Sequence, residues 1–211
     1  MPHPSQVVLY VDDDILVLNK PCELLSVPGK TDKDSLATRA AVHFGHYRID
    51  KMVVHRLDRA TSGVMVLARS EQALKGLHAQ FRERRVHKRY VAVVEGVVQG
   101  EEGEVDVPLS RDMDNPPMSM VCLEGKPSLT QWSVIGRGSD RTRLSLTPVT
   151  GRSHQLRLHT KAMGHPILGD EFYAPPEALA KADRCLLHAE TLAFMHPNTG
   201  EAMLFRVPCP F

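Results

Sequence analysis

One segment of the chain sets a carboxylate among basic and hydroxyl side chains, a pattern that could perform acid–base chemistry. Residues 55–63 read His-Arg-Leu-Asp-Arg-Ala-Thr-Ser-Gly, with Asp58 between two arginines. A carboxylate in such a loop can act as a general base or as a nucleophile, without a cofactor. The same residues could instead form an Asx-turn in which Thr61 or Ser62 caps the aspartate. These residues alone leave both interpretations open.

The sequence lacks the motifs of several other kinds of catalytic site. It contains no Gly-x-x-x-x-Gly-Lys-Ser/Thr phosphate loop, no Gly-x-Gly-x-x-Gly opening a helix and no Gly-x-Ser-x-Gly elbow. Among its 11 histidines there is no His-Glu-x-x-His. His154 and His159 are five residues apart, so on a helix they point to different faces. We therefore expect neither a metal site nor a cofactor.

The cysteines indicate no cross-linked or zinc-bound scaffold. Cys22, Cys122, Cys185 and Cys209 lie far apart and form no Cys-x-x-Cys pair. This spacing argues against a zinc ribbon, a redox motif and a disulfide framework. We interpret the four side chains as buried or half-buried thiols.

Charge is segregated along the chain although the net charge is only +1. Residues 82–89 hold five Lys or Arg against one acid, and residues 137–161 hold six against Asp140. Acids gather instead at residues 12–14 and 101–104. Such a chain can present a positive face to a phosphate backbone. Charge runs are also common on solvated helix faces, so this pattern by itself only permits nucleic-acid binding.

The elements that would position these residues are mostly short strands. Alternation and turn residues predict strands at residues 7–11, 15–18, 52–54, 63–68, 90–94, 103–109, 118–123, 129–135, 143–146, 186–194 and 203–207. The first two should form a hairpin, and the four between residues 103 and 146 an antiparallel meander. The segment 63–68 is nearly all apolar, so it should be buried on both faces.

Four helices complete the predicted elements. Ser35 can cap a helix that runs to about Phe44, and Ser70 an amphipathic helix that runs to Phe81. A third helix covers residues 154–163 and ends at Gly164, and a short one lies near residues 177–182. The mixture predicts an α+β fold with much antiparallel pairing.

The 55–63 segment resembles the signature of the RluA-type pseudouridine synthases, His-Arg-Leu-Asp-x-x-Thr-Ser-Gly, at every specified position. Similar segments follow the family's order along the whole chain, at residues 11–21, 24–29, 88–90, 151–157 with 164–170, and 187–189. The resemblance implies the pseudouridine synthase fold, a mixed and mainly antiparallel sheet with flanking helices. It also implies one catalytic domain over residues 1–211, with no N-terminal S4 RNA-binding domain before the hairpin at residue 7.

The reaction implied by this resemblance detaches uracil from C1′ of a uridine, turns the base and rejoins it through C5. Asp58 takes the indispensable role, either attacking C1′ or removing the 2′ proton, and both routes stay open. Arg157, from a Gln-x-Arg motif, is implied as the buried cation that keeps Asp58 ionised. Tyr90 is implied to stack on the flipped uracil, with its hydroxyl placed to help remove the C5 proton.

Further residues are assigned to RNA binding and to the scaffold of the site. Arg56 resembles the side chain that fills the space left by the flipped nucleotide. Candidate phosphate contacts are Arg59, Arg82, Arg85, Lys88, Arg152 and Lys161. We expect His55 to be neutral and structural, and His165 and Asp170 to belong to the scaffold.

The partner implied by the resemblance is RNA, namely a short stem-loop in 23S ribosomal RNA, with transfer-RNA anticodon stem-loops as a second substrate. We expect a cytoplasmic protein, because residues 1–5 lack a secretory pattern and no apolar run approaches the ~20 residues that span a bilayer. We also expect a monomer. Two alternatives remain, a non-catalytic RNA-binding module and a nucleoside hydrolase.

Overall fold

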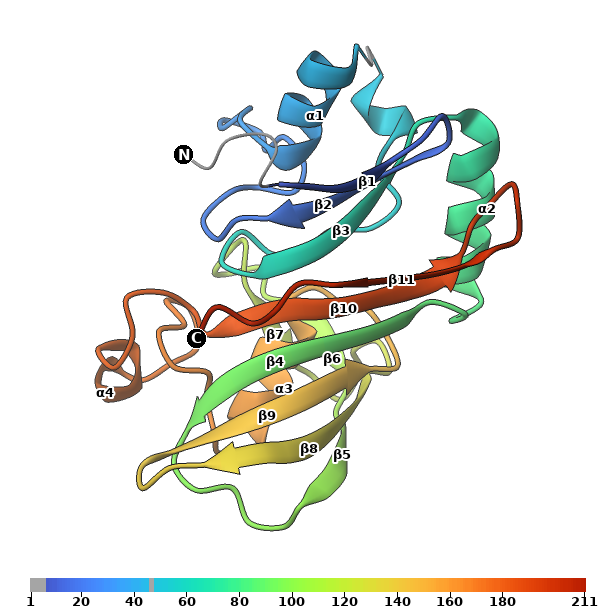
Figure 1. Ribbon diagram of the computed structural model, residues 1–211. Helices are drawn as coiled ribbons and strands as arrows, with labels where there is room; N and C mark the ends of the chain where they lie inside the picture. The colour runs from blue at the N-terminus through green and yellow to red at the C-terminus, as the bar shows by residue number, and fades with distance from the viewer. Residues whose placement is uncertain (1–6, 46–47) are drawn as a thin grey trace. The chain divides into compact units, whose positions relative to one another are not determined.

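The structure, a computed structural model, describes residues 7–45 and 48–211 (Figure 1). The chain divides into two compact units: the first unit is Met1–Lys88 with Ala189–Pro210, and the second is Arg89–His188 with Phe211. Residues 1–5, on which the expectation about secretion depends, lie outside the described residues. Within the described part, no helix has the length and apolar content needed to cross a membrane.

The first unit contains a mainly antiparallel sheet built on the predicted hairpin. Its strands are β1 (Val8–Val11), β2 (Ile15–Lys20), β3 (Ser62–Ala68), β10 (Leu187–Met195) and β11 (Ala202–Arg206). They lie in the order β1-β2-β3-β10, with β11 paired to β10. The β1–β2, β2–β3 and β10–β11 pairs are antiparallel. The hairpin and both C-terminal strands were predicted from the sequence and are confirmed.

The core of this unit lies between the sheet and helix α2 (Glu71–Arg82). All seven residues of β3 are buried, as the apolar run predicts. Ser70 caps α2 by accepting a hydrogen bond from the main-chain amide of Ala73, and Leu77 packs into the same cluster as Val66. Figure 1 shows α2 along one side of this unit. Burial of this apolar stripe holds the helix in place.

Helix α1 (Leu36–Phe44) also begins and ends where the sequence predicts. Ser35 accepts a hydrogen bond from the amide of Thr38, and Gly45 ends the helix in a left-handed conformation with φ of 70°. The strand predicted at residues 52–54 was wrong. Residues Ile49–Lys51 form a 3₁₀ turn, and the amide of Met52 donates to the carbonyl of Ile49 within it. Of residues 52–54, only Val53 forms a β-bridge to β3.

In the second unit, four sheet strands pair in the order β4-β9-β8-β5. These strands are β4 (His87–Glu95), β5 (Glu102–Asp106), β8 (Leu129–Arg137) and β9 (Arg141–Pro148). Their pairings β4–β9, β8–β9 and β5–β8 are all antiparallel. The predicted abundance of antiparallel pairing is confirmed here.

The simple meander predicted between residues 103 and 146 was wrong. The expected strand at 103–109 divides into β5 and β6 (Leu109–Arg111), and β6 pairs with β7 (Ser119–Val121) in a separate ribbon. Pro108 lies at the division, and proline has no amide hydrogen to donate to a strand ladder. As a result β5 pairs with β8 instead of with its neighbour in sequence.

Two helices complete the second unit, α3 (Gln155–Ala162) and the short α4 (Pro176–Leu179). Residues 155–160 of α3 are all buried, and the helix contacts β7, β8 and β9. Gly164 follows its C-terminus with φ of 84°, as predicted. The α+β fold with flanking helices is therefore confirmed, and α3 carries two of the predicted functional side chains, Arg157 and Lys161.

Candidate active site

The signature loop, residues 55–63, contains a turn that is closed by a main-chain hydrogen bond. The amide of Thr61 donates to the main-chain carbonyl of Asp58 at 3.1 Å. Asp58 is half-buried, while Leu57 and Ala60 beside it are buried. The alternative of an Asx-turn capped by Thr61 or Ser62 stays a prediction.

A second segment, the 20–26 loop, is hydrogen-bonded to the signature loop. The Ser26 hydroxyl donates to the carbonyl of Leu57 at 2.6 Å and accepts from the amide of the same residue at 3.0 Å. The Cys22 thiol lies 3.1 Å from the carbonyl of Ala60. These bonds fix the main chain on both sides of Asp58.

Lys20 is the central part of this support and was missed in the sequence analysis. Its side chain is fully buried, and its ammonium donates to the carbonyls of Pro21, Leu24 and Arg59 at 2.9, 2.6 and 3.1 Å. A buried charge of this kind is stable only when its hydrogen bonds are made. The available signal was a lysine ending an apolar strand, followed by Pro21, within a segment that matched the family.

Gly63 ends the signature because no other residue fits there. Its φ is 118°, and a Cβ atom at this position would lie 2.1 Å from the carbonyl oxygen of Ala189. Both the backbone conformation and the close approach of β10 require glycine. The motif glycine therefore allows the main chain to pass directly from the loop into β3.

His55 is structural, as expected. Its Nε2 accepts a hydrogen bond from the amide of Val66 at 3.1 Å, and its ring stacks on Phe81 with centroids 4.7 Å apart. Burial, followed by the charge of Lys88, lowers the pKa of His55 to about 3. The ring is therefore neutral near pH 7 and orients the start of the signature loop.

The basic side chains predicted to contact RNA in the first unit are mostly exposed. Arg56 and Arg59 are exposed, and Arg59 forms an ion pair with Glu23 at 3.3 Å. Arg82 and Arg85 both lie near Glu83 on the surface, where such pairs contribute little stability and can be exchanged for a phosphate.

Lys88 differs from those arginines because it is half-buried. Burial, followed by the charge of Arg84, lowers the pKa of Lys88. Its surroundings therefore disfavour the charged ammonium, which makes it a weaker candidate for a phosphate contact than the exposed arginines of the same unit.

Arg157, in the second unit, is one of the most buried side chains and not a surface arginine. Its Nε donates to Asp170 Oδ2 at 2.7 Å and its Nη2 to Asp170 Oδ1 at 2.5 Å. The two side chains are 2% and 0% exposed. The burial of this cation is confirmed, while its expected role toward Asp58 stays a prediction. Its bidentate partner is a residue assigned only to the scaffold.

Aromatic side chains complete the surroundings of Arg157. Its guanidinium carbon lies 5.0 Å from the ring centroids of both Phe172 and Tyr173. The Tyr173 hydroxyl contacts His154 Nδ1 at 2.6 Å and accepts from the amide of Ser119 at 2.9 Å. These contacts join the start of α3 to β7 around the buried cation.

The other predicted residues of the second unit lie on different elements. Tyr90 is half-buried on β4, opposite Leu146 of β9. Arg152 is exposed in the loop before α3, and Lys161 is exposed on α3 with its ammonium 5.8 Å from the ring centroid of Tyr173. Gln155, of the same Gln-x-Arg motif, donates to the carbonyl of Leu129 at 2.9 Å and so ties α3 to β8.

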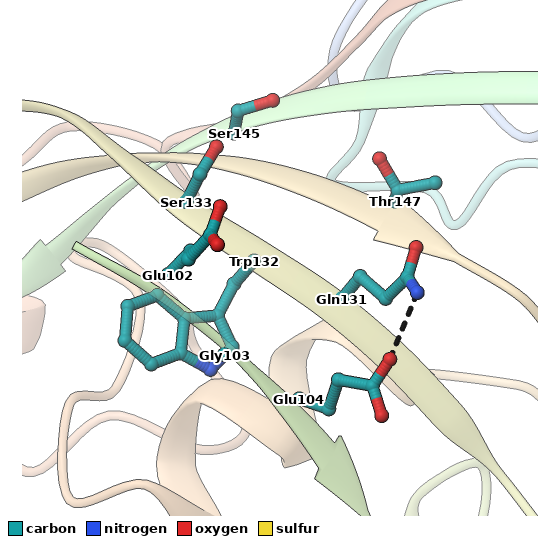
Figure 2. A pocket seen from close by; sticks show the side chains of 8 residues that line it. All are labelled: Glu102, Gly103, Glu104, Gln131, Trp132, Ser133, Ser145 and Thr147. Atoms are coloured by element: carbon teal, nitrogen blue, oxygen red, sulfur yellow. Dashed lines mark hydrogen bonds between the residues drawn. The ribbon is translucent and has the colours of Figure 1, made fainter. Parts of the chain in front are cut away.

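A surface pocket of the second unit contains none of the predicted site residues (Figure 2). It measures about 390 Å³ and is lined by Glu102, Gly103, Glu104, Gln131, Trp132, Ser133, Ser145 and Thr147. Its carboxylates would repel an RNA phosphate, and Glu104 is held by Gln131 at 2.8 Å. We therefore do not assign the pocket to the active site.

Metal ligands do not cluster in the described part of the chain. Within residues 7–45 and 48–211, no three His, Cys, Asp or Glu side chains are arranged so as to hold a metal ion. Cys185 is buried and the other cysteines are half-buried, which confirms that part of the interpretation from the sequence.

Comparison with known proteins decides the family. The family model described as RNA pseudouridylate synthase matches residues 14–162, which include the signature loop, Tyr90 and Arg157. The chain belongs to this family. Among curated proteins, the dual-specificity RNA pseudouridine synthases RluA of Escherichia coli (strain K12) and Pasteurella multocida are similar. They are 51% and 48% identical to the chain, each match covering 99% of this chain and 95% of the relative.

Solved structures of pseudouridylate synthases share the fold. Human RNA pseudouridylate synthase domain containing 1 is 28% identical with a TM-score of 0.81, covering 100% of this chain and 87% of that one. Human RNA pseudouridylate synthase domain containing 4 is 26% identical with a TM-score of 0.75, covering 98% and 89%. The chain is an RNA pseudouridine synthase of the RluA type, an isomerase that converts uridine to pseudouridine in RNA.

Proposed function

We propose that this pseudouridine synthase modifies uridines in both ribosomal and transfer RNA, with Asp58 as its catalytic carboxylate. The relatives that match it almost end to end are named dual-specificity enzymes. The observation that carries the assignment of Asp58 is its unaltered signature loop, held by Lys20 and Ser26 at either side of the aspartate. Such support on the main chain pre-organises a side chain for chemistry.

In the proposed reaction the N1–C1′ bond of uridine breaks, a C5–C1′ bond forms, N1 gains a proton and C5 loses one. No electron or group is exchanged with another molecule, so the proposed reaction needs no redox partner and no group donor. Asp58 either attacks C1′ or removes the 2′ proton, and both roles require its ionised form. Arg157 is the proposed cation of the site.

Tyr90 and Arg56 are proposed to handle the base and the gap that it leaves. The Tyr90 ring stacks on the flipped uracil, and its hydroxyl assists removal of the C5 proton after the base has rejoined. Arg56, exposed beside Asp58, occupies the space left in the RNA. The exposed Arg59, Arg82, Arg85, Arg152 and Lys161, together with the half-buried Lys88, are the proposed phosphate contacts.

The proposed substrates are short stem-loops in 23S ribosomal RNA and in transfer-RNA anticodon arms. Loops of this kind let a base be splayed out cheaply, since flipping costs least for an unpaired base. The motifs fall in both units, so we propose that the two units serve as one catalytic domain. We also propose that the enzyme acts as a monomer in the cytoplasm.

Tritium release tests the reaction, and sequencing tests the substrates. RNA labelled with tritium at C5 of uridine should lose the label without releasing free uracil. Free uracil would instead indicate a hydrolase, and binding without either product a non-catalytic module. Sequencing after carbodiimide treatment, in cells with and without the gene, should show lost sites in both 23S ribosomal RNA and transfer RNA. Loss in only one class of RNA would contradict dual specificity.

A further inference from the structure

Asp170 is a fully buried carboxylate to which neither the reaction nor the RNA contacts give a role. Both of its oxygens bond the guanidinium of Arg157, at 2.7 and 2.5 Å. Oδ1 also accepts from the amides of Phe172 and Tyr173 at 3.0 and 3.3 Å. The carboxylate is therefore held by the main chain, and it in turn holds the arginine.

The main chain at Asp170 has little freedom to move. Gly169 has φ of 70°, and a Cβ atom at this position would lie 2.0 Å from the carbonyl oxygen of Arg184. The amide of Gly169 donates to the carbonyl of Ala178 at 3.1 Å. Because this segment is constrained, the Asp170 carboxylate stays in one position and restricts the side chain that it bonds.

A bidentate bond fixes the plane of a guanidinium as well as its position. Asp170 engages two of the five N–H groups of Arg157, those on Nε and on one side of Nη2. The rings of Phe172 and Tyr173 lie 5.0 Å away from its central carbon and restrict its tilt. Asp170 and the two rings thus restrict the orientation of the guanidinium.

We infer that Asp170 is a positioning residue for catalysis, which holds the guanidinium of Arg157 in the orientation that its proposed role requires. This inference rests on the proposed role of Arg157. It assigns to the Gly-Asp pair at 169–170 a function in the chemical step and not only in folding. A misplacement of a catalytic group by about 1 Å can cost ~100-fold in rate.

The test is the single-turnover rate of tritium release at saturating enzyme, measured beside the RNA dissociation constant. Asp170→Asn keeps the shape of the side chain and an acceptor for the amides of Phe172 and Tyr173. It removes the negative charge, and it places a side-chain NH₂ group opposite one N–H of Arg157. We expect the rate to fall about 10- to 100-fold, while the dissociation constant changes less than about twofold. An unchanged rate would overturn the inference.

Asp170→Glu is a second variant that keeps the charge pair inside the fold. Its extra methylene displaces the guanidinium, so we expect it to fold, to bind RNA and still to react at least about tenfold more slowly. A wild-type rate in a folded Asp170→Glu protein would show that orientation is unimportant.

A matched control separates orientation from general destabilisation. Thr142 is buried in the same unit, where its hydroxyl accepts from the amide of Val98 and donates to the carbonyl of Gly96. Thr142→Val removes both bonds without touching Arg157. Compared at temperatures where the two variants are equally folded, Thr142→Val should react at the wild-type rate and Asp170→Asn should not. Equal losses in both would overturn the inference.

A double-mutant cycle with Arg157→Lys distinguishes the inference from the proposed function. If Asp170 acts through Arg157, the Arg157→Lys/Asp170→Asn protein should be no slower than Arg157→Lys alone. Multiplied losses would overturn the inference, since Asp170 would then act independently. A wild-type rate for Arg157→Lys would instead contradict the proposed role of Arg157 itself.

Discussion

The ammonium of Lys20 donates a hydrogen bond to the main-chain carbonyl of Arg59, which directly follows Asp58 and lies 39 residues further along the chain. The same ammonium bonds the carbonyls of Pro21 and Leu24. One buried charge therefore joins the end of β2, the 20–26 loop and the signature loop. Its loss should affect both folding and catalysis.

Lys20→Met replaces the ammonium with an apolar group of similar length. The buried carbonyl of Leu24 then loses this donor, as do the part-buried carbonyls of Pro21 and Arg59, so we expect the free energy of unfolding to fall by about 1–3 kcal/mol. The signature loop loses its anchor, and the single-turnover rate should fall even at temperatures where the protein is fully folded. Urea titration and tritium release measure the two effects. A variant with wild-type stability would contradict the role that we assign to Lys20.

Asp58→Asn keeps the shape of the side chain and removes the base or nucleophile. We expect the single-turnover rate to fall by up to about 10⁴-fold, with folding and RNA affinity nearly unchanged. Glu104→Gln serves as the control, because it also removes one carboxylate, from the surface pocket, and should leave the rate unchanged. Retention of a tenth of the wild-type rate by Asp58→Asn would rule out its proposed role.

Tyr90→Phe deletes the hydroxyl and preserves the ring. Stacking on the base should persist, so the RNA dissociation constant should stay within about twofold of the wild-type value. Removal of the C5 proton should slow by about 100-fold or more, because the group that assists it is gone. Tritium release measures this step directly. Weaker binding with an unchanged rate at saturation would show that Tyr90 contacts RNA in another way.

Thr61→Val should stabilise the protein. Thr61 is 2% exposed, and its hydroxyl oxygen has no hydrogen-bond partner among the described residues. Since an unsatisfied buried hydroxyl costs about 1–3 kcal/mol, the isosteric valine should raise the free energy of unfolding by ~1 kcal/mol. Thermal unfolding measures this change in stability. Thr130→Val is the control, because the Thr130 hydroxyl is hydrogen-bonded to Gln155 and His159. Destabilisation by Thr61→Val would mean that the hydroxyl has a partner in solution.

His55 should make the stability depend on pH. Its pKa is lowered from 6.5 to about 3 by burial and then by Lys88, so the unfolded chain binds a proton more tightly than the folded one. The neutral ring contributes its full stability above pH 6.5, and this contribution is lost as the pH falls toward 3. The slope in this window is at most about 1.4 kcal/mol per pH unit. His55→Gln keeps an acceptor for the amide of Val66 and should flatten that slope. An identical slope in the variant would contradict the assignment.

The sequence by itself determined the family and most of the elements. The signature at 55–63 is a contiguous pattern, so it could be read without knowing what lies around it. Ser35 and Ser70 predicted the starts of two helices, and the apolar run at 63–68 predicted a buried strand, because capping and burial patterns depend on neighbours in sequence. The strand at 52–54 failed because a turn of three residues can override so short a pattern.

Only the tertiary structure decided which side chains support the site. Lys20 and Asp170 lie in segments that resemble the family, but each gains its supporting role from a partner 39 or 13 residues away. The pairing of β5 with β8, and not with β6, is likewise a long-range contact. Local sequence sets propensity, but a buried lysine or a bidentate ion pair is stable only when the folded chain supplies every hydrogen bond that water has lost. That requirement is met by the fold as a whole, which is why it could not be predicted from one segment.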